Sequence, residues 1–294
     1  MLFYLKQKTF FVKSNKMSNA GLYIVATPIG NLGDLSPRAK EVLTDADVIA
    51  AEDTRVAKKL FSLLGIPLHK TFITYEDHSE QERFQEIIDL INDGKMVALI
   101  SDAGSPLISD PGFKLVRECR RQGIKVTTLP GACAVISALQ LSGLPTNRFM
   151  FAGFVPNKDK ARCDLFTELK NINTTLVLYE TALRLEKTLA ALAQVMPQRE
   201  IAVVREISKM YEECISGSIA EVRERLLQNP IKGEIVLVIA PPADEEQTTP
   251  DIEELLREEL KHSTVKEAVR HICDTYKLKR NDVYEKALEL KNKQ

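Results

Sequence analysis

Seven carboxylates of this chain lie at or beside the ends of short apolar runs, where a parallel sheet presents side chains to a ligand. They are Glu52, Asp53, Asp102, Asp110, Glu180, Glu206 and Glu234. Carboxylates gathered at one sheet edge can remove protons as general bases or can bind a divalent cation. The cation alternative has little support, because the four histidines are scattered along the chain. We therefore expect acid–base chemistry or ligand contacts, and no metal site.

Some of these carboxylates have a structural alternative. Asp110 precedes Pro111 and an amphipathic run, so we expect it to cap the N-terminus of a helix. Glu52-Asp53-Thr54 also precedes a helix, and one of its members is expected to cap that helix. Asp102 has no helix to cap, which makes it the strongest candidate for contact with a ligand.

Asp102 belongs to the loop Ser101 to Gly112, which reads SDAGSPLISDPG. An apolar run, Met96 to Ile100, precedes this loop and an amphipathic run follows it, so a strand leads into the loop and a helix leads out. Two glycines and two prolines allow the backbone to approach a bound molecule closely. The pattern predicts that this loop holds a small cofactor.

Other segments support weaker interpretations. Thr27 to Asp34 (TPIGNLGD) is not a dinucleotide fingerprint, because its glycines are spaced G-x-x-G, and it forms either a wall for a flat ring or a simple tight turn. No phosphate-binding GxxxxGK[ST] or nucleophilic GxSxG occurs. The polar segment from Tyr75 to Arg83 is either a substrate lid or a solvated connection.

The scaffold for these residues is predicted by the alternation of short apolar runs with amphipathic segments as far as Leu141. This order indicates an α/β fold with a mainly parallel sheet. After Gly143-Leu144-Pro145 the runs Ile201 to Val204 and Glu212 to Ile215 follow each other without a helix, which predicts a second, mixed sheet. We expect four segments: a flexible extension (1–19), an N-terminal α/β domain (20–143), a C-terminal α/β domain (144–243) and a helix-turn-helix-like tail (251–294). Met17 is an alternative translation start.

Composition limits where and what the chain binds. The net charge is −1, so affinity for nucleic acid has to come from a local basic patch. Six lysines and arginines between Lys261 and Arg280 form such a patch, which contacts phosphates or is an ordinary solvated surface. The five cysteines lack zinc spacing and no apolar run is long enough to span a membrane, so we expect a cytoplasmic protein with reduced thiols.

Several blocks together resemble a known family. They are LYIVATPIGNLGDLSPRA, IAAEDTR, SDAGSPLISDPG, LPGACAV, SGLPTNRFMFAGFVP, LVLYE and REISKMYEE. In this order they resemble the signature blocks of the bacterial 16S rRNA cytidine 2′-O-methyltransferase I family, which belongs to the tetrapyrrole-methylase-like S-adenosylmethionine enzymes. The match runs from Gly21 to Ala240, and the tail resembles the helix-turn-helix segment of these proteins.

The resemblance implies a two-domain fold, a homodimer, and S-adenosylmethionine in the cleft between the domains. Carried over by motif, the expected cofactor-binding residues are Pro28, Asp102, Ala103, Gly104, Ser105, Pro106, Ile108, Gly131, Cys133, Leu178 and Tyr179. Two blocks depart from the family pattern. Thr181-Ala182-Leu183-Arg184 stands where Ser-Pro-His-Arg is usual, and Pro130-Gly131-Ala132-Cys133-Ala134 stands where PGPSA is usual.

The function implied is transfer of a methyl group to a ribose 2′-hydroxyl of small-subunit rRNA. Candidates for removing the hydroxyl proton are Glu52, Asp53, Glu180 and Lys209, and Arg205 and Glu206 are plausible as well. Candidates for contacts with RNA phosphates are Arg55, Lys58, Lys158, Lys160, Arg162, Lys277, Lys279 and Arg280. A tetrapyrrole methyltransferase and an RNA-binding protein without catalysis remain as alternatives.

Overall fold

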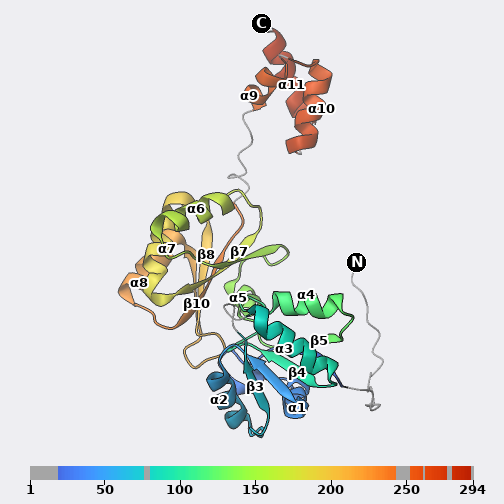
Figure 1. The fold of residues 1–294 in the computed structure, drawn as a ribbon. Helices are drawn as coiled ribbons and strands as arrows, with labels where there is room; N and C mark the ends of the chain where they lie inside the picture. Colours follow the sequence, from blue (N-terminus) through green and yellow to red (C-terminus); the bar gives the residue numbers. More distant parts are fainter. Residues whose placement is uncertain (1–18, 76–79, 243–251, 261, 277–279, 293–294) are drawn as a thin grey trace, which may run out of the picture.

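The computed structural model describes residues 19–75, 80–242, 252–260, 262–276 and 280–292 (Figure 1). Nearly all of the expected N-terminal extension lies outside these residues. Two sheets and a set of C-terminal helices make up the described chain. The α/β class predicted from the sequence is confirmed.

The first sheet has five parallel strands in the order β3-β2-β4-β1-β5. The strands are β1 (Gly21–Val25), β2 (Val48–Ala51), β3 (Thr71–Thr74), β4 (Met96–Ile100) and β5 (Val126–Leu129). The helices between them are α1 (Pro37–Asp45), α2 (Thr54–Leu64), α3 (Glu80–Asn92) and α4 (Phe113–Arg121). Helices α1 and α2 bury one face of the sheet, and α3 and α4 bury the other. Because both faces are covered, β4 is an unbroken apolar run.

The second sheet is mixed, as predicted, with the order β6-β7-β10-β8-β9. Its strands are β6 (Phe149–Phe154), β7 (Thr175–Thr181), β8 (Glu200–Arg205), β9 (Glu213–Ser218) and β10 (Glu234–Ile239). Strands β6 and β7 are parallel, and the other pairs are antiparallel. One face is covered by α6 (Asp159–Leu169), α7 (Ala182–Val195) and α8 (Ile219–Gln228).

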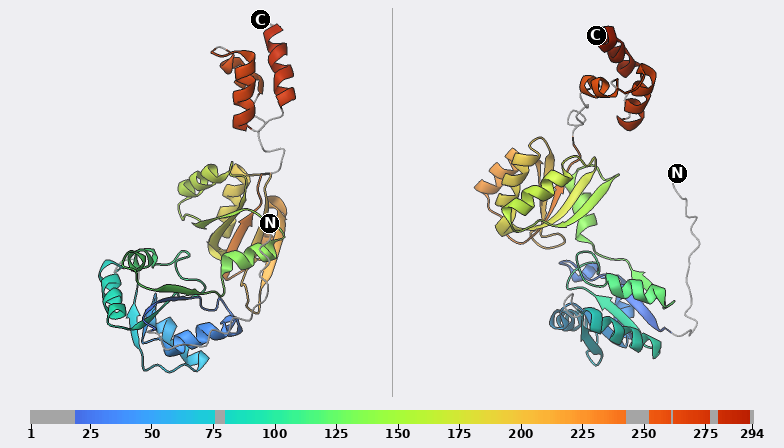
Figure 2. Two further views of the ribbon diagram at one scale, coloured as in Figure 1. Left: turned by 90° about the vertical axis from the view of Figure 1, so that its right-hand side faces the viewer. Right: turned by 45° about the horizontal axis from the view of Figure 1, so that its top comes forward.

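The other face of the second sheet is covered by α5 (Ala134–Ser142), which comes from the first half of the chain. Val135, Ala138 and Leu139 pack there against residues of β7, β8 and β10. Figures 1 and 2 show α5 at the junction between the two sheets. The expected boundary at residue 143 thus separates α5 from the sheet that it covers.

The C-terminal helices are α9 (Ile252–Glu259), α10 (Val265–Tyr276) and α11 (Arg280–Asn292). They share a small apolar core of their own, centred on Leu256, Val269, Ile272 and Val283. Within the described ranges, no helix is both long and apolar enough to cross a lipid bilayer.

Local signals decide where several helices begin and end. The Ser36 hydroxyl accepts a hydrogen bond of 3.1 Å from the Ala39 N–H at the start of α1, and Gly65 ends α2 with φ 69°. Serine before a first-turn proline and glycine after the last turn are common sequence signals for the two ends of a helix. Strand β3 was not expected, and Tyr75 directly after it is fully buried, with its N–H donating to the Ala51 carbonyl at 2.8 Å. Tyr75 therefore belongs to the core, while Glu76, Asp77 and His78 of the same segment, expected as a lid or a solvated connection, lie outside the described residues.

Candidate functional site

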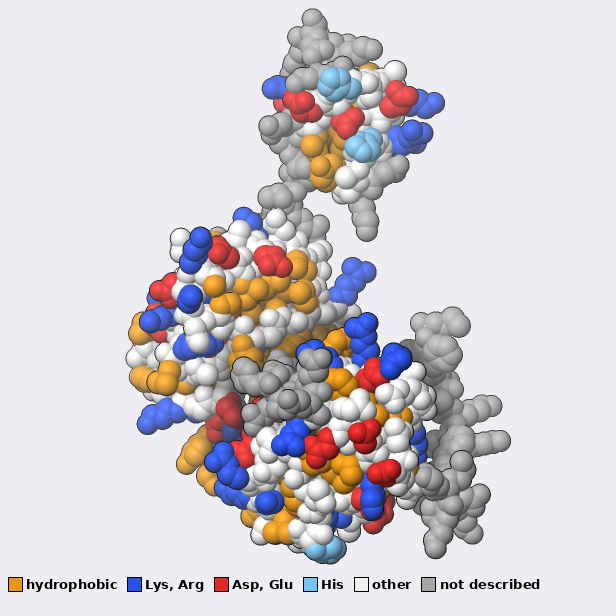
Figure 3. Space-filling view, viewed as in Figure 1, with side chains coloured by type: hydrophobic (Ala, Val, Ile, Leu, Met, Phe, Trp, Pro, Cys, Tyr) orange, Lys and Arg blue, Asp and Glu red, His pale blue; other side chains and the backbone are white. Residues whose placement is uncertain are grey.

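A cleft of about 490 Å³ lies between the carboxyl ends of the first sheet and the second sheet. The first half of the chain lines it with Ile29, Glu52, residues 102–105 and 108–110, Cys133 and Ala134. The second half contributes Phe154, residues 179–181, Ile207 and residues 233–236. Figure 3 shows carboxylate side chains in the hollow between the two units. Eight of these lining residues were not expected from the sequence: Ile29, Ala134, Phe154, Thr181, Ile207, Gly233, Ile235 and Val236.

The loop after β4 has an unusual backbone. Gly104 and Gly112 have φ of 83° and 130°, and the non-glycine residues Leu107 and Ser109 have φ of 71° and 68°. Thr27 and Gly104 exchange two backbone hydrogen bonds, at 2.8 and 3.1 Å, which tie this loop to the end of β1. Left-handed non-glycine residues carry strain that neighbouring structure has to hold, and they are concentrated at binding sites.

Asp102 and Asp53 occupy this edge of the sheet together. The Asp53 N–H donates to the Asp102 carboxylate at 3.1 Å. Burial raises the pKa of Asp102 above its ordinary value, and the nearby charge of Asp53 acts in the same direction. Asp53 itself caps α2, as one residue of its block was expected to do, and pairs with Arg55 at 2.7 Å. Hydrogen bonds from Arg55 lower the pKa of Asp53 to about 2, so Asp53 is a weak base.

Asp110 does not cap a helix, contrary to the expectation from the sequence. Helix α4 begins after Gly112, which has φ 130° and provides no side-chain cap. Asp110 therefore lies two residues outside the cap position, and it lines the cleft.

Alternation along β7 decides which of its residues reach the cleft. Leu178 points into the core beneath α6 and α7, whereas Tyr179 points to the cleft side. The Tyr179 ring contacts Phe151 and Phe154 edge to face, at 4.8 and 5.1 Å between ring centroids. Burial raises the pKa of Tyr179 to about 12, so its hydroxyl stays protonated.

Glu180 is buried and fully engaged. Its carboxylate accepts hydrogen bonds from the Arg184 guanidinium at 2.6 Å, from the Thr188 hydroxyl and from the Thr181 N–H. Arg184 also donates to the Val155 carbonyl at 2.7 Å and to the Asn157 side chain. This network joins the end of β7 to the segment after β6 and therefore stabilises the fold.

Lys209 bridges two carboxylates beside the cleft, Glu206 at 3.1 Å and Glu234 at 2.7 Å. Partial burial acts to lower the pKa of Lys209, but the hydrogen bonds to Glu234 and Glu206 outweigh it and the pKa lies above its ordinary value. The ammonium group therefore stays charged. Glu206 and Ser208 of the same loop have φ of 48° and 63°.

The sequence of this chain was compared with family profiles and with known proteins. Residues 21–223 match the profile of the tetrapyrrole (corrin/porphyrin) methylases, and residues 246–291 match the RsmI C-terminal HTH domain. The chain is 49% identical to the ribosomal RNA small subunit methyltransferase I of Erythrobacter litoralis, over 92% of this chain and 95% of that protein. It is 42% identical to the protein of the same name from Pasteurella multocida, over 91% and 96%. The chain belongs to the ribosomal RNA small subunit methyltransferase I family.

Solved structures share the fold of this family. A cobalt precorrin-4 methyltransferase, CbiF, aligns with a TM-score of 0.56 and 16% identity, covering 76% of this chain and 95% of that one. Diphthine synthase aligns with a TM-score of 0.56 and 16% identity, covering 74% and 89%. At this identity the likeness shows the fold alone.

Four of the residues expected to bind a cofactor in this methyltransferase I family member lie outside the cleft lining: Pro28, Pro106, Gly131 and Leu178. Pro106 lines a neighbouring apolar cavity of about 470 Å³, which shares Ser105, Ile108 and Cys133 with the cleft. A Cβ atom on Gly131 would lie 2.9 Å from the Ala26 Cβ, so this glycine lets the segment before α5 approach β1. Leu183, where the family usually has histidine, is 96% exposed.

The residues expected to contact RNA in this family member are spread over several surfaces. Arg55, Lys58, Lys158 and Lys160 are exposed. Arg162 is only 2% exposed, pairs with Asp159 at 2.8 Å and donates to the Asn157 carbonyl, so its assignment to an RNA surface was wrong. Arg280 lies at the start of α11, and Lys277 and Lys279 lie outside the described residues.

Proposed function

We propose that this chain transfers the methyl group of S-adenosylmethionine to the 2′-hydroxyl of a cytidine ribose in small-subunit (16S) ribosomal RNA. Family membership supports methyl transfer to rRNA. The observation that carries the proposal is the cleft, which joins Asp102 and the strained loop of the first sheet to Tyr179 of the second. The ribose position, the cytidine and the homodimer implied by the resemblance are parts of this proposal.

The volume and lining of the cleft fit S-adenosylmethionine. Its volume of about 490 Å³ lies in the range of about 300–1,000 Å³ that holds small molecules. Ile29, Ile108, Phe154 and Val236 provide apolar walls, while Asp102, Ser105 and Asp110 add polar residues to the lining. A Cβ on Gly104 would lie 3.2 Å from the Ile29 side chain, so a larger residue here would narrow the cavity.

When bound, S-adenosylmethionine supplies a methyl group already activated by its sulfonium charge. The chain therefore has to orient the acceptor, exclude water and accept a proton. We assign the carboxylate of Asp102 to a polar group of the cofactor. Of the four candidates for proton removal, Glu52 and Glu180 line the cleft, and the carboxylate of Glu180 is buried in its ion pair with Arg184. Because its position lets it reach the cleft, Glu52 is the candidate that we retain.

The RNA is held by basic residues outside the cleft. Arg55 follows the Asp53 cap closely at the cleft edge, and its side chain is 90% exposed. Lys58, about one helical turn further along α2, lies over the Phe72 ring at 5.3 Å. The helix-turn-helix tail provides a second contact. These contacts are expected to weaken with added salt, as phosphate contacts do.

The test is methyl transfer with labelled S-adenosylmethionine, offered to 30S subunits and to naked 16S rRNA. We expect label in the ribose fraction of nucleoside digests with one of the two substrates. Label on a base would contradict the ribose assignment. Label in neither RNA, with the cofactor still bound in calorimetry, would favour another acceptor, and a tetrapyrrole acceptor would then be tried.

A further inference from the structure

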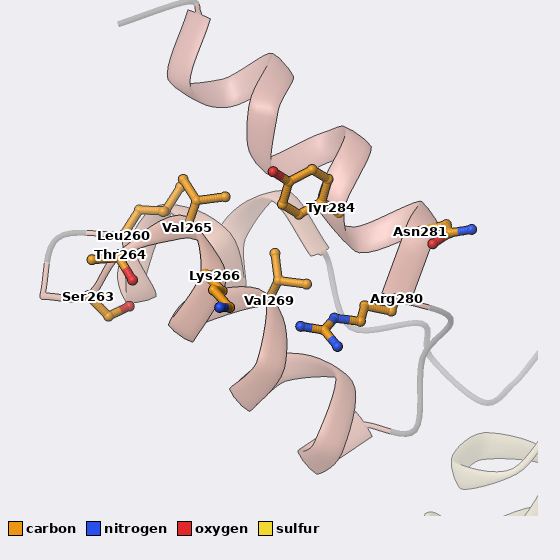
Figure 4. Close-up of a pocket in the computed structure, with 9 residues that line it drawn as sticks. All are labelled: Leu260, Ser263, Thr264, Val265, Lys266, Val269, Arg280, Asn281 and Tyr284. Atoms are coloured by element: carbon orange, nitrogen blue, oxygen red, sulfur yellow. The ribbon is translucent and has the colours of Figure 1, made fainter.

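Another cavity of the described chain lies in the C-terminal helices, separate from the cleft. It has a volume of about 630 Å³ and lies where the α9–α10 turn, α10 and the start of α11 meet. Figure 4 shows Arg280 and Tyr284 extending from α11 toward Lys266 and Val269 of α10. Nothing in the proposed chemistry uses this cavity.

The lining of this cavity is cationic on one side and aromatic on another. Among the described residues it contains two basic side chains, Lys266 and Arg280, and no carboxylate. Neither of these two forms an ion pair with another residue that the structure describes. Two acidic groups of the same module have partners: Glu267 accepts hydrogen bonds from Thr264 at the start of α10, and Glu259 pairs with His271 at 2.7 Å. Asp282, Glu285 and Glu289 of α11 are not among the residues that line the cavity. Such a lining attracts an anion.

Tyr284 gives the cavity a second kind of contact. Its ring lines the cavity and is 46% exposed, although the core of the module, at Val269 and Val283, lies directly beside it. An exposed aromatic ring beside cationic side chains is the combination that holds single-stranded nucleic acid, with a base stacked on the ring and the phosphate on the cations.

The order of the helices agrees with this interpretation. In helix-turn-helix modules the first residues of the second helix contact the nucleic acid. Here α10 and α11 form the pair, and Arg280 and Tyr284 lie in the first two turns of α11. The cavity therefore opens where such a module meets its ligand.

We propose that the cavity between α10 and α11 holds one unpaired nucleotide of the substrate RNA, with its phosphate at Lys266 and Arg280 and its base on Tyr284. This rests on the proposed function for the identity of the RNA. It deepens that function by separating a tail subsite, which holds a nucleotide, from the cleft, where the methyl group moves.

The charge test uses the full chain and a short, fluorescently labelled single-stranded RNA. We expect Lys266→Gln with Arg280→Gln to weaken binding and to reduce the slope of log affinity against log salt by about 0.7 for each phosphate that is no longer neutralised. The matched control is Arg257→Gln with Lys286→Gln, which removes two charges from the same module outside the cavity. Equal slopes for the two double variants would overturn the proposal.

The stacking test uses Tyr284→Ser and Tyr284→Phe. We expect the serine variant to lose about tenfold in RNA affinity and the phenylalanine variant to match the parent chain. The control is Tyr276→Ser, which removes an exposed ring from the end of α10 and should have little effect on RNA affinity. Circular dichroism of each variant checks that the helices remain folded, and a Tyr284→Ser chain that is folded and binds RNA normally contradicts the proposal.

The two proposals fail in different ways. If the parent chain transfers methyl groups to rRNA while the cavity variants bind RNA as tightly as their controls, the subsite is wrong and the function stands. If the parent chain transfers nothing to rRNA but the cavity variants lose RNA affinity, the function is wrong and the subsite stands.

Discussion

Asp102 is kept in a position that disfavours its own charge. Partial burial raises its pKa and the charge of Asp53 adds to the effect, whereas the hydrogen bond from the Asp53 N–H acts in the opposite direction without cancelling it. Because the folded-state pKa is raised, the ionised carboxyl destabilises the fold at neutral pH, and this penalty disappears as the pH falls through the raised pKa toward the ordinary value. A carboxylate retained at such a site is more readily explained by ligand binding than by stability.

The substitution Asp102→Asn should separate these two effects. The asparagine side chain keeps an oxygen that can accept the Asp53 N–H, but it lacks the charge. We expect cofactor affinity to fall by about tenfold or more, since hydrogen bonds to charged groups contribute about 1.5–3 kcal/mol. The melting temperature at pH 7 should be equal to or above that of the parent chain, and this difference should vanish in acid. Calorimetry and thermal melts check both, and unchanged affinity would remove Asp102 from the cofactor site.

For Glu180 we expect the opposite pattern, a loss of stability without a loss of activity. Glu180→Gln weakens the buried pair with Arg184 and the contact with Thr188, so we expect a loss of about 3 kcal/mol in the free energy of unfolding. Methyl transfer by the molecules that remain folded should be nearly normal. A variant with an unchanged denaturation curve and no transfer would instead make Glu180 the proton acceptor.

At the scale of elements, the loop between β8 and β9 joins the two halves of the cleft. The Ser208 hydroxyl hydrogen-bonds to Asp34 after the first strand. A Cβ on Gly30 would lie 2.4 Å from the Lys209 Cγ, so the lysine stem fills the space above that glycine. Ile29 and Ile207, beside these contacts in sequence, both line the cleft. The loop thus holds the two walls at a set distance.

A double-mutant cycle tests this coupling. Gly30→Ala should displace Lys209, with a loss of about 1–3 kcal/mol in the free energy of unfolding and weaker cofactor binding. Lys209→Ala alone loses the bridge to Glu206 and Glu234 but leaves room at Gly30. We expect the double variant to be less damaged than the sum of the single ones. Strictly additive losses would mean that the stem and Gly30 act independently.

Elements with strong local signals could be predicted from the sequence, and those decided by tertiary contacts could not. Ser36-Pro37 and Gly65 mark the ends of α1 and α2 through their own side chain or conformation. Strand β3 is short, lies at the sheet edge and has two threonines in four residues, so its apolar signal is weak. The place of Asp110 depends on the backbone at Gly112, which no spacing rule predicts.

For the whole molecule, the cleft and the tail should be separable. A chain ending at Pro242 keeps every residue that lines the cleft. We expect its cofactor affinity to equal that of the full chain, while its RNA affinity and salt dependence fall. Calorimetry with S-adenosylmethionine and RNA titrations at two salt concentrations check this. If the shortened chain loses cofactor binding, the two parts are coupled.

The residues of the site could be predicted where they lie in a recognisable sequence block, and not where tertiary contacts bring them to the cleft. Asp102 to Ser105 and Tyr179 lie in sequence blocks that resemble a family, and the cleft brings them together. Ile207 lies in such a block, but nothing in its residue type indicates contact with a ligand. Gly233 lies outside the blocks and reaches the cleft because β10, which follows it, pairs antiparallel with β8. Pairing between distant strands leaves no local pattern in a sequence.

The position of helix α5 also determines where two members of the family can recombine without loss of packing. If two members of the family recombined at residue 143, Val135, Ala138 and Leu139 of one parent would meet the sheet of the other. A crossover near Ala132 would instead transmit the helix together with its sheet, and with Cys133 and Ala134 of the cleft wall. Asp102 would then descend from one parent and its facing wall from the other. Hybrids joined at that point should fold. The two facing walls of their cleft would then come from different parents.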